Sequence, residues 1–503
     1  WQVTDNQDII WRVTGSIPNV KISYSTNSGG DGYPNVISAS APATYTQITP
    51  PYLWEGKYTW TNIPANIIGD QLRIRVSTVD GNWQNLTPNT PDFKVRGKIE
   101  VVAPNGGETY WVYNPTYQTT LYPIQWRITG TTLTSVKIGV STNGGGGPFS
   151  TILITPTAGT GLYTYNWPVS DTVTTAGIIK VWDNNYPGDT PEPVYNVSNA
   201  TFNIKSKLEL TAPITTTVWE VGQGGQITWE SAGSIGNVVL EYRNASGSWV
   251  EVVTTPCNSA GSYSYTWPSV ADVITTTAKV RIRPVNIVYA DIKESPAFSI
   301  KTRLAVDKPV LNDEYIVYNP PYQSSTYPIS WTYSGTVNQV KLQYKSGAGV
   351  WTDIATVSAG ASGKGVYNWP VPNAINSSVY VKVIDADSGH PASVSPDSSQ
   401  FRIKGKLIVD VPATGNEWVY QENRTITWTA VGSTGNVKVE YSTDDGNTWK
   451  TQAINYSAAT VSGTNNTQSW TIPDVVSSTC LVRVLTTDGW QNVSSISVKF
   501  TIK

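Results

Sequence analysis

The chain has 503 residues, and its 34 basic and 36 acidic residues give a net charge of −2. This balance argues against a nucleic-acid binder, which would carry a basic face, and against charge-driven disorder. A single His and two Cys leave few residues for metal or acid–base chemistry. No apolar run comes near the roughly 18 residues of a membrane-spanning helix, so we predict no membrane insertion in this segment.

The residues between Gly and Pro are mainly Val, Ile, Thr, Tyr and Trp, which favours β-strands. Aromatic residues recur about every hundred positions and indicate five internal repeats. The three recurring columns are Trp11, Trp126, Trp229, Trp331 and Trp428; Trp60, Trp167, Trp267, Trp369 and Trp470; and Phe93, Phe202, Phe298, Phe401 and Phe500. We expect these rings to fill cores, since a sugar-stacking platform would need exposed rings.

Each repeat is predicted to contain the same succession of short strands. The first Trp lies in an alternating run, and a second alternating strand follows, as at residues 437–441. A Gly- and Asn-rich turn comes next, as at 444–447, and then a strand that ends with the second Trp and a nearby Pro. Two closing strands follow, as at 381–384 and 401–404.

About seven strands per hundred residues are typical of an Ig-like sandwich. We therefore predict an all-β protein of five tandem Ig-like (fibronectin-III-like) antiparallel β-sandwiches in an extended rod. The expected domains are residues 1–98, 99–206, 207–303, 304–405 and 406–503.

Several motifs carry a family resemblance that covers all five repeats and is sharpest in the fifth. The fifth repeat reads Ile-Thr-Trp at 426–428, Val-Lys-Val-Glu-Tyr-Ser-Thr-Asp-Asp-Gly-Asn-Thr-Trp at 437–449 and Cys-Leu-Val-Arg-Val at 480–484. With Pro-Asn-Gly-Gly-Glu at 104–108, these motifs resemble an Ig-like repeat of prokaryotic surface and secreted proteins. That repeat is similar to the Ig-like domain of the Ser/Thr-rich, GPI-anchored yeast cell-wall family. The fourth repeat departs from the pattern at 309–314.

The resemblance implies an extracellular or cell-surface location and a structural or adhesive role. It supplies no catalytic residues, and a fold alone does not give a function. We therefore expect a non-enzymatic segment of an extracellular filament, stalk, sheath or adhesin, with copies of itself or neighbouring surface proteins as partners. The alternative is a carbohydrate-binding or adhesion array that accompanies a secreted enzyme and binds polysaccharide.

The junctions between repeats are short. The closing strand of one repeat is followed after one to three residues by the opening strand of the next, as at 205–207 and 404–406. Such linkers are far from the flexible Gly/Ser regime, so adjacent domains should be held at restricted angles. Strands of about 8–10 residues would make each domain roughly 30–40 Å long.

The second and fourth repeats carry matching insertions rich in Tyr and Pro, at 113–123 and 318–328. Tyr is common at interfaces, and loops often carry specificity, so the insertions are the candidate interaction surface. The alternative is a loop that packs on the neighbouring domain and stiffens the junction. The candidate residues are Tyr113, Tyr117, Tyr122, Tyr318, Tyr322 and Tyr327.

The first repeat lacks the segment that precedes its opening Trp, which should leave one sheet edge open. The chain starts at Trp1 and contains no Met, so we expect a processed product or a segment of a longer array. A strand donated by another subunit is the second explanation.

Other motifs give little support for chemistry. Residues 442–449 match an Asp-box locally, but the pattern is also that of a hairpin turn. The acidic clusters at 183–189 and 385–387 make a Ca²⁺ site conceivable, although neither has the ordered spacing of a calcium loop. His390 has no second His or Cys near it in the sequence, and Cys257 and Cys480 lie in different repeats. We expect no cofactor.

Overall fold

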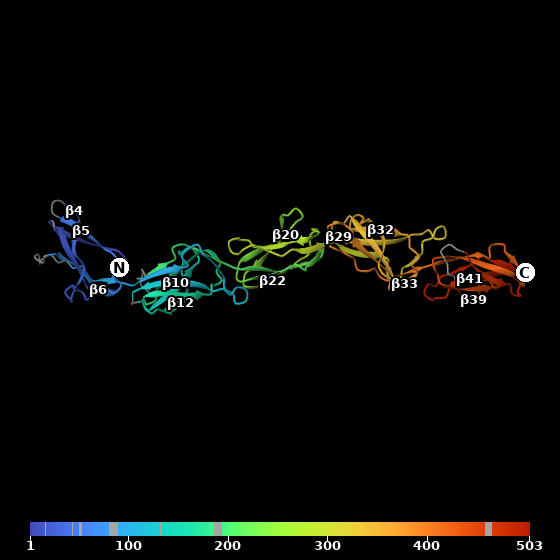
Figure 1. Ribbon diagram of the computed structural model, residues 1–503, viewed down its shortest axis with the longest axis horizontal. Helices are drawn as coiled ribbons and strands as arrows, with labels where there is room; N and C mark the ends of the chain where they lie inside the picture. The colour runs from blue at the N-terminus through green and yellow to red at the C-terminus, as the bar shows by residue number, and fades with distance from the viewer. Residues whose placement is uncertain are drawn as a thin grey trace.

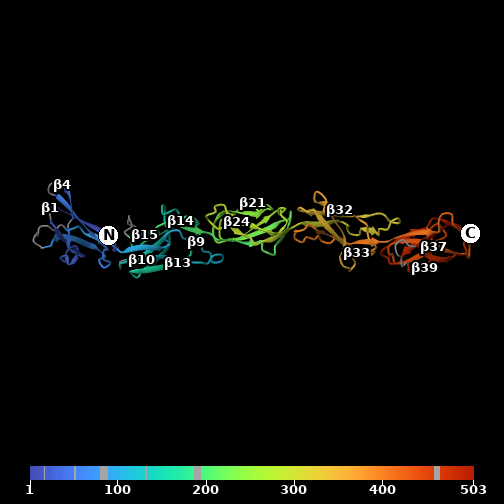
Figure 2. The same cartoon turned by 45° about the horizontal axis from the view of Figure 1, so that its top comes forward.

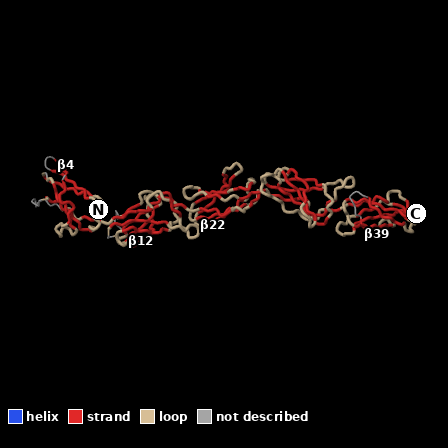
Figure 3. The backbone as a smooth tube through the Cα atoms, in the orientation of Figure 1, coloured by secondary structure: helices blue, strands red, loops and turns tan. Residues whose placement is uncertain are grey.

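The computed structural model describes residues 1–15, 17–42, 44–49, 53–79, 89–130, 133–185, 194–457 and 465–503. Within these residues the regular structure is entirely β-strand, without a helix (Figure 3). The strands form small sheets that follow one another along one long axis (Figures 1 and 2). The prediction of an all-β protein of tandem sandwiches in an extended arrangement is confirmed. In the part of the chain described, no helix has the length and apolar character needed to cross a membrane.

The second sandwich shows the common plan most completely. One sheet has the order β13-β10-β8, and the other has the order β12-β11-β14-β16-β9, with β15 paired to β14. Strand β9 runs parallel to β16, whereas the other pairs are antiparallel. The strands are β8 (Lys98–Ala103), β9 (Thr109–Trp111), β10 (Tyr122–Thr129), β11 (Ser135–Ser141), β12 (Ser150–Pro156), β13 (Gly161–Trp167), β14 (Thr174–Asp183), β15 (Tyr195–Val197) and β16 (Phe202–Lys205).

The third sandwich repeats this plan with the sheets β17-β19-β22, β21-β20-β24-β25 and β18-β26-β23. Its strands are β17 (Leu208–Ala212), β18 (Val218–Glu220), β19 (Gly225–Ser231), β20 (Gly236–Arg243), β21 (Trp249–Cys257), β22 (Gly261–Trp267), β23 (Thr275–Ala278), β24 (Val280–Pro284), β25 (Lys293–Glu294) and β26 (Phe298–Lys301).

The fourth sandwich has the sheets β27-β29-β32 and β28-β34-β33-β30-β31. Its strands are β27 (Arg303–Lys308), β28 (Glu314–Ile316), β29 (Tyr327–Ser334), β30 (Gln339–Ser346), β31 (Thr352–Ser358), β32 (Lys364–Trp369), β33 (Asn376–Asp385) and β34 (Phe401–Lys404).

The fifth sandwich has the sheets β35-β37-β40 and β36-β43-β41-β38-β39, with β42 on β41. Its strands are β35 (Lys406–Val411), β36 (Glu417–Trp418), β37 (Asn423–Val431), β38 (Asn436–Ser442), β39 (Lys450–Ser457), β40 (Asn465–Thr471), β41 (Ser477–Thr486), β42 (Ser494–Ile496) and β43 (Phe500–Ile502).

The first sandwich departs from this plan at one edge. Its sheets are β1-β5-β4 and β3-β2-β6-β7, so β1 has a neighbour on one side only among the described residues. The equivalent strands β10, β19, β29 and β37 each lie between two neighbours. The strands are β1 (Gln7–Thr14), β2 (Asn19–Ser25), β3 (Asn35–Pro42), β4 (Thr44–Thr49), β5 (Leu53–Trp60), β6 (Gly69–Thr78) and β7 (Phe93–Val95).

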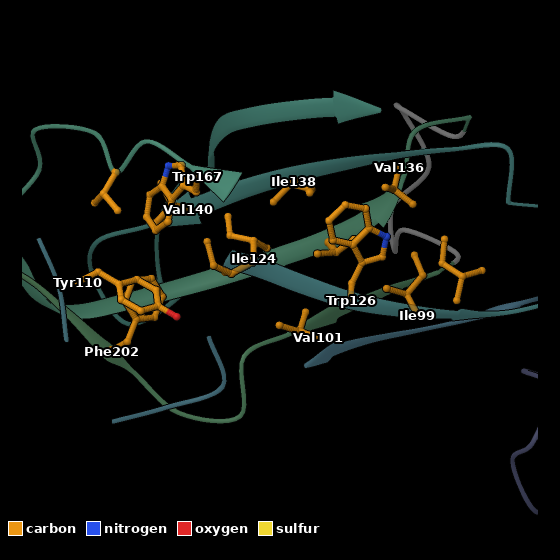
Figure 4. Packing of buried hydrophobic residues seen from close by; sticks show 14 of the residues in the cluster. Ile99, Val101, Tyr110, Ile124, Trp126, Val136, Ile138, Val140, Trp167 and Phe202 are labelled. Atoms are coloured by element: carbon orange, nitrogen blue, oxygen red, sulfur yellow. The ribbon is translucent and has the colours of Figure 1, made fainter. Parts of the chain in front are cut away.

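The alternating pattern of each strand places its apolar residues between the two sheets. In the second sandwich Trp126 lies among Ile99 and Val136 near one end of the core, while Trp167 lies beside Tyr110 and Phe202 near the other (Figure 4). The Tyr110 and Trp167 rings meet edge to face with centroids 6.3 Å apart. Such aromatic pairs add about 0.5–1.5 kcal/mol beyond area burial.

Among the described residues, the buried hydrophobic side chains form five clusters. Each cluster keeps within one predicted domain, except that Val431 of the fifth repeat packs into the cluster of the fourth. Both tryptophan columns are buried, as expected for core residues. The boundaries between domains stay a prediction.

Two of the first-column tryptophans pack directly on a glycine of the neighbouring strand. Trp331 faces Gly365, and Trp11 faces Gly56. A Cβ at Gly365 would overlap the Trp331 ring and the Ala359 carbonyl oxygen. This strand position therefore has to lack a side chain in the fourth sandwich.

Substituting Gly365→Ala should destabilise the fourth sandwich by about 1–3 kcal/mol, because the added methyl group forces the Trp331 ring out of its packing. Hydrogen exchange of the fourth sandwich during urea titration measures the change. Val366→Ala is the matched control, since the neighbouring Val366 side chain is 64% exposed. Equal losses in the two variants would contradict the explanation.

Candidate functional site

Neighbouring sandwiches are connected through a single buried residue. Gly97, Ser206, Thr302 and Gly405 each link a closing strand to the next opening strand, and all four are buried. Ser206 N donates to the Tyr289 carbonyl oxygen at 2.8 Å. Thr302 Oγ1 donates to Asp385 Oδ2 at 2.9 Å. The link is thus hydrogen-bonded to the late hairpin of the sandwich that follows it.

In the second to fifth sandwiches, a glycine after the first-column strand faces the preceding sandwich. These residues are Gly130, Gly233, Gly335 and Gly432. A Cβ at Gly432 would lie 3.0 Å from Val317 Cγ2 and Ile375 Cδ1, and one at Gly335 would lie 3.1 Å from Ile274 Cδ1. The missing side chain lets the loop of one sandwich approach the apolar end of the previous one closely.

Among the described residues, the glycine is accompanied at three junctions by hydrogen bonds between an acidic or amide side chain of the preceding sandwich and the residue after the glycine, which we call the polar bracket. Asp171 Oδ1 accepts a hydrogen bond from Ser234 N at 2.7 Å, and its Oδ2 accepts one from Ser234 Oγ at 2.8 Å. At the next junction Thr336 Oγ1 donates to Asp272 Oδ2 at 2.6 Å.

The junction between the fourth and fifth sandwiches uses an amide in the same place. Asn373 Oδ1 accepts from Ser433 N at 2.9 Å, and Asn373 Nδ2 donates to Ser433 Oγ at 2.9 Å. The acidic or amide residue always follows the second-column Trp by four or five positions.

The first tyrosine insertion bridges the second and third sandwiches. Asn114 and Gln118 close the loop by exchanging backbone hydrogen bonds of 2.7 and 2.9 Å. The Tyr117 hydroxyl then lies 3.1 Å from Ser262 Oγ of the third sandwich. Tyr122 stacks on the buried Tyr110 with ring centroids 4.6 Å apart, so it anchors the insertion to its own core. Tyr113 is half-buried.

The second insertion repeats this geometry between the fourth and fifth sandwiches. Tyr327 stacks on Tyr315 with centroids 4.6 Å apart. Lys406 Nζ of the fifth sandwich donates to the Tyr322 carbonyl oxygen at 3.0 Å. The side chains of Tyr318 and Tyr322 are 37% and 36% exposed. In both insertions one tyrosine is therefore packed inward and another residue of the loop contacts the following sandwich.

The sequence analysis did not identify three half-buried tryptophans as a surface feature. They lie near the start of the second strand in the hairpins β20–β21, β30–β31 and β38–β39. Each lies under a cation from the strand on the far side of the hairpin's first strand: Arg281 over Trp249 at 4.5 Å, Lys382 over Trp351 at 4.2 Å and Arg483 over Trp449 at 4.2 Å. The sequence did contain a signal for these pairs. A Trp stands at the start of the hairpin's second strand, and an Arg or Lys stands near the middle of the later strand that pairs with the hairpin's first strand. Cation–π contacts of this kind contribute about 0.5–1 kcal/mol at exposed sites.

A buried carboxylate accompanies two of these cations. Glu241 contacts Arg281, with Nε 2.6 Å from Oε2, and Glu440 contacts Lys438 and Arg483. Although burial acts to raise the pKa of Glu440, the hydrogen bonds from Lys438 and Arg483 leave that pKa below its ordinary value. These carboxylates are consequently held as paired anions.

The Asp-box-like turn is a hairpin stabilised by its own side chains. Asp444 Oδ1 accepts from Thr448 N at 2.8 Å and from Ser442 Oγ at 2.7 Å. Hydrogen bonds from Thr448 and Ser442 lower the pKa of the Asp444 carboxyl to about 2. The arrangement is that of an Asp-capped turn.

His390 contacts the acidic pair that shortly precedes it in the sequence. His390 Nδ1 lies 2.9 Å from Asp385 Oδ2, and Asp387 completes the group. Asp385 also accepts from the linking Thr302, and Asp387 accepts from Asn338 N and Gln339 N at 2.7 and 3.0 Å. The group fixes the link and its neighbouring strand, because each of its carboxylate oxygens accepts at least one hydrogen bond.

The remaining candidates for chemistry are the acidic cluster at 183–189 and the two cysteines. Part of the acidic cluster at 183–189 lies outside the described residues, and Asp183 Oδ1 accepts from Asn185 N at 2.9 Å. Cys257 and Cys480 are free and buried in separate clusters. Burial raises the pKa of both thiols, which keeps them protonated and unreactive near neutral pH.

Comparison with solved structures gives tandem-repeat proteins at low identity. A tetra-tandem repeat from the extending region of a large adhesion protein is 15% identical, covers 81% of this chain and all of its own, and has a TM-score of 0.26. The I67–I69 fragment of titin is 12% identical over 59% of this chain and 98% of its own, with a TM-score of 0.24. The fibronectin(III)-like modules of Clostridium thermocellum CbhA are 16% identical over 40% and 94%, with a TM-score of 0.15.

TM-scores of this size carry no argument about arrangement or function. No protein-family model and no curated protein matches the chain. The likeness to the yeast cell-wall family therefore finds no support beyond its motifs. The assignment to tandem Ig-like sandwiches rests on the strand order and on the parallel pairing of β9, β18, β28 and β36 with the closing strands.

Substituting Asp171→Ala should loosen the junction between the second and third sandwiches, because the Ser234 amide loses its acceptor and the Ser234 hydroxyl keeps only the Asn258 carbonyl oxygen. We expect a loss of about 0.5–1.5 kcal/mol of junction stability, measured as faster hydrogen exchange at Ser234. Asp474→Ala is the control, since the exposed Asp474 holds the equivalent position in the fifth sandwich. Unchanged exchange at Ser234 would rule out the bracket.

The second sandwich should lose stability in alkali between about pH 10 and pH 12. Burial, assisted by the Glu108 carboxylate, raises the pKa of Tyr110 from 10.0 to about 12. The folded state favours the neutral phenol, so this contribution is complete below the unfolded pKa and is lost as the pH rises through the folded one. Thermal unfolding of the parent and of Tyr110→Phe across this range tests the effect, since the variant should lack this part of the pH dependence.

Proposed function

We propose that the chain is a non-enzymatic structural protein, a stiff segment of an extracellular filament, stalk, sheath or adhesin. The observation that carries the proposal is the junction, which combines one buried link residue with a recurring glycine contact. The flexible linkers of independently moving domains lack both features. The proposal includes the predicted domain limits, which are 1–98, 99–206, 207–303, 304–405 and 406–503.

Its partners are copies of itself or neighbouring proteins at the cell surface. The exposed Tyr318 and Tyr322 lie on a loop already anchored to a core, which presents their rings without a large entropy cost on binding. The tyrosine insertions thus serve as the candidate contact surface, while part of each insertion holds its junction.

A carbohydrate-binding array is the second candidate. The aromatic–cation pairs at Trp249, Trp351 and Trp449 recur on successive sandwiches, and aromatic rings are the usual platforms for sugars. Their half-buried rings each have one face covered by a cation, which leaves less ring surface for a sugar than an open platform offers.

In solution the chain should scatter X-rays as a rod. Strand lengths of roughly 30–40 Å per sandwich give a maximum dimension on the order of 150–200 Å. Small-angle scattering measures this length, and the Asp171→Ala variant should show a broader distance distribution than Asp474→Ala. A compact parent particle, or one as flexible as a chain of beads, would refute the stiff rod.

A polysaccharide-binding assay separates the two candidate functions. Binding that falls in Tyr117→Ala and Tyr322→Ala would favour the carbohydrate array, with the tyrosine insertions as its surface. We expect no binding by the parent chain to cell-wall polysaccharides. Binding retained in both variants would clear these tyrosines.

A further inference from the structure

The outer face of the larger sheet in the fourth sandwich carries two lysines around one tryptophan. Lys382 lies between the fully buried Val381 and Val383 of β33, so its side chain is on the outer face. Lys345 Nζ lies 5.1 Å and Lys382 Nζ lies 4.2 Å from the centroid of the Trp351 ring. The two nitrogens are therefore no more than about 9.3 Å apart, the sum of these distances. Three adjacent strands build this face, because β30 and β33 supply the lysines and Trp351 directly precedes β31.

The positive charges of this face have no paired carboxylate. Among the described residues, no Asp or Glu forms an ion pair with Lys345 or Lys382. Asp353 on β31 is engaged by two other side chains. Lys341 Nζ lies 2.8 Å from Asp353 Oδ2, and Gln343 Nε2 donates to Asp353 Oδ1 at 2.6 Å. The two ammonium groups at Trp351 therefore stay available to an anion from outside the chain.

One position distinguishes this face from those of the third and fifth sandwiches. Gln343 of β30 lies opposite Lys382 of β33. At the same register the third and fifth sandwiches have the pairs Glu241–Arg281 and Glu440–Arg483. Each of these glutamates forms an ion pair with the arginine that lies over the tryptophan of its sandwich. The fourth sandwich has an uncharged amide where those two sandwiches carry their own anion.

We propose that this face, defined by Lys345, Trp351, Tyr380 and Lys382, binds an extended acidic segment of a neighbouring surface protein. In an extended chain, residues i and i+2 point to the same side at a spacing of roughly 6.5–7 Å. Two carboxylates at this spacing reach both ammonium groups. The Tyr380 ring, with its centroid 5.3 Å from Lys345 Nζ, and the 84% exposed Val350 add apolar surface beside the charges.

An acidic polysaccharide fits this face less well than a peptide. Trp351 is half-buried and has ammonium groups near its ring, so little of the ring is left as a platform for a sugar. A peptide needs no such platform, because its carboxylates lie on flexible side chains. The nature of the partner rests on the proposed function, whereas the site depends on the fourth sandwich alone. X-ray scattering of the chain without peptide tests the rod, so the two proposals can fail separately.

A fluorescently labelled peptide, Gly-Thr-Glu-Thr-Glu-Thr-Gly, tests the site on the whole 503-residue chain. We expect its anisotropy to rise with a dissociation constant on the order of 0.1 mM at low salt. Added salt should weaken the binding, because exposed charges are screened. A peptide with Gln in place of both Glu residues is the control and should not bind. No binding of the acidic peptide up to about 1 mM, or equal binding of the two peptides, would overturn the proposal.

The variant Gln343→Glu gives the fourth sandwich the carboxylate that the third and fifth already have. The new carboxylate should pair with Lys382 and weaken peptide binding about three- to ten-fold. Two other sandwiches fold with Glu at this register, so we expect the thermal unfolding temperature to be kept. Gln226→Glu is the matched control, since it adds the same charge at an exposed position of the smaller sheet in the third sandwich. An equal loss of binding in both variants would contradict the site.

Two further outcomes would assign the face to a different occupant and overturn the proposal. Polygalacturonate that displaces the peptide at a lower carboxylate concentration than polyglutamate does would identify an acidic polysaccharide as the ligand. Dimers of the parent chain, seen by light scattering and lost in Gln343→Glu, would identify a second copy of the chain.

Discussion

The short connection between consecutive sandwiches is the constraint on which the rest of the structure depends. One or two residues, one of them buried, separate the closing strand of a sandwich from the next opening strand, and Ser206 and Thr302 are further tied to the hairpin beyond them. The two sandwiches consequently meet at a fixed place. That fixed approach lets a glycine loop reach the apolar end of the preceding core, and it keeps Asp171 within hydrogen-bonding distance of Ser234. With a long solvated link, neither contact would persist against the entropy of two independently moving bodies.

Local pattern predicts the interior of this protein well. The tryptophan and phenylalanine columns recur because each fills the same place in a core, and alternation marks which strand residues face inward. The junction contacts could not be predicted in this way, because they join positions about sixty residues apart. Asp171 and Ser234 each read as ordinary turn residues. Two recurring features of the sequence indicated these junction contacts. One is an acidic or amide residue after the second-column Trp, and the other is Gly-Ser or Gly-Thr after the first-column strand.

The acidic pair near His390 shows a related limit of sequence reading. The acidic residues were only weak evidence for a Ca²⁺ site, and their spacing alone gave no reason to connect them with the link at Thr302. Folding brings these distant groups together because the late hairpin of the fourth sandwich covers its entry. The tyrosine insertions had two open interpretations for the same reason. Tyr122 and Tyr327 pack against the cores of their own sandwiches. The contacts of Tyr117 and Tyr322 instead depend on where the next sandwich lies.

The placement of these insertions divides the junctions into two kinds. Those between the second and third sandwiches and between the fourth and fifth have a polar bracket and also a tyrosine loop that contacts the following sandwich. The junction between the third and fourth has the Asp272–Thr336 bracket without an insertion. Additional contacts across a junction raise the free energy needed to bend it. Bending should therefore concentrate at alternate junctions, so that a pair of sandwiches is the mechanical unit. The pair is also the unit in which the insertions recur along the sequence.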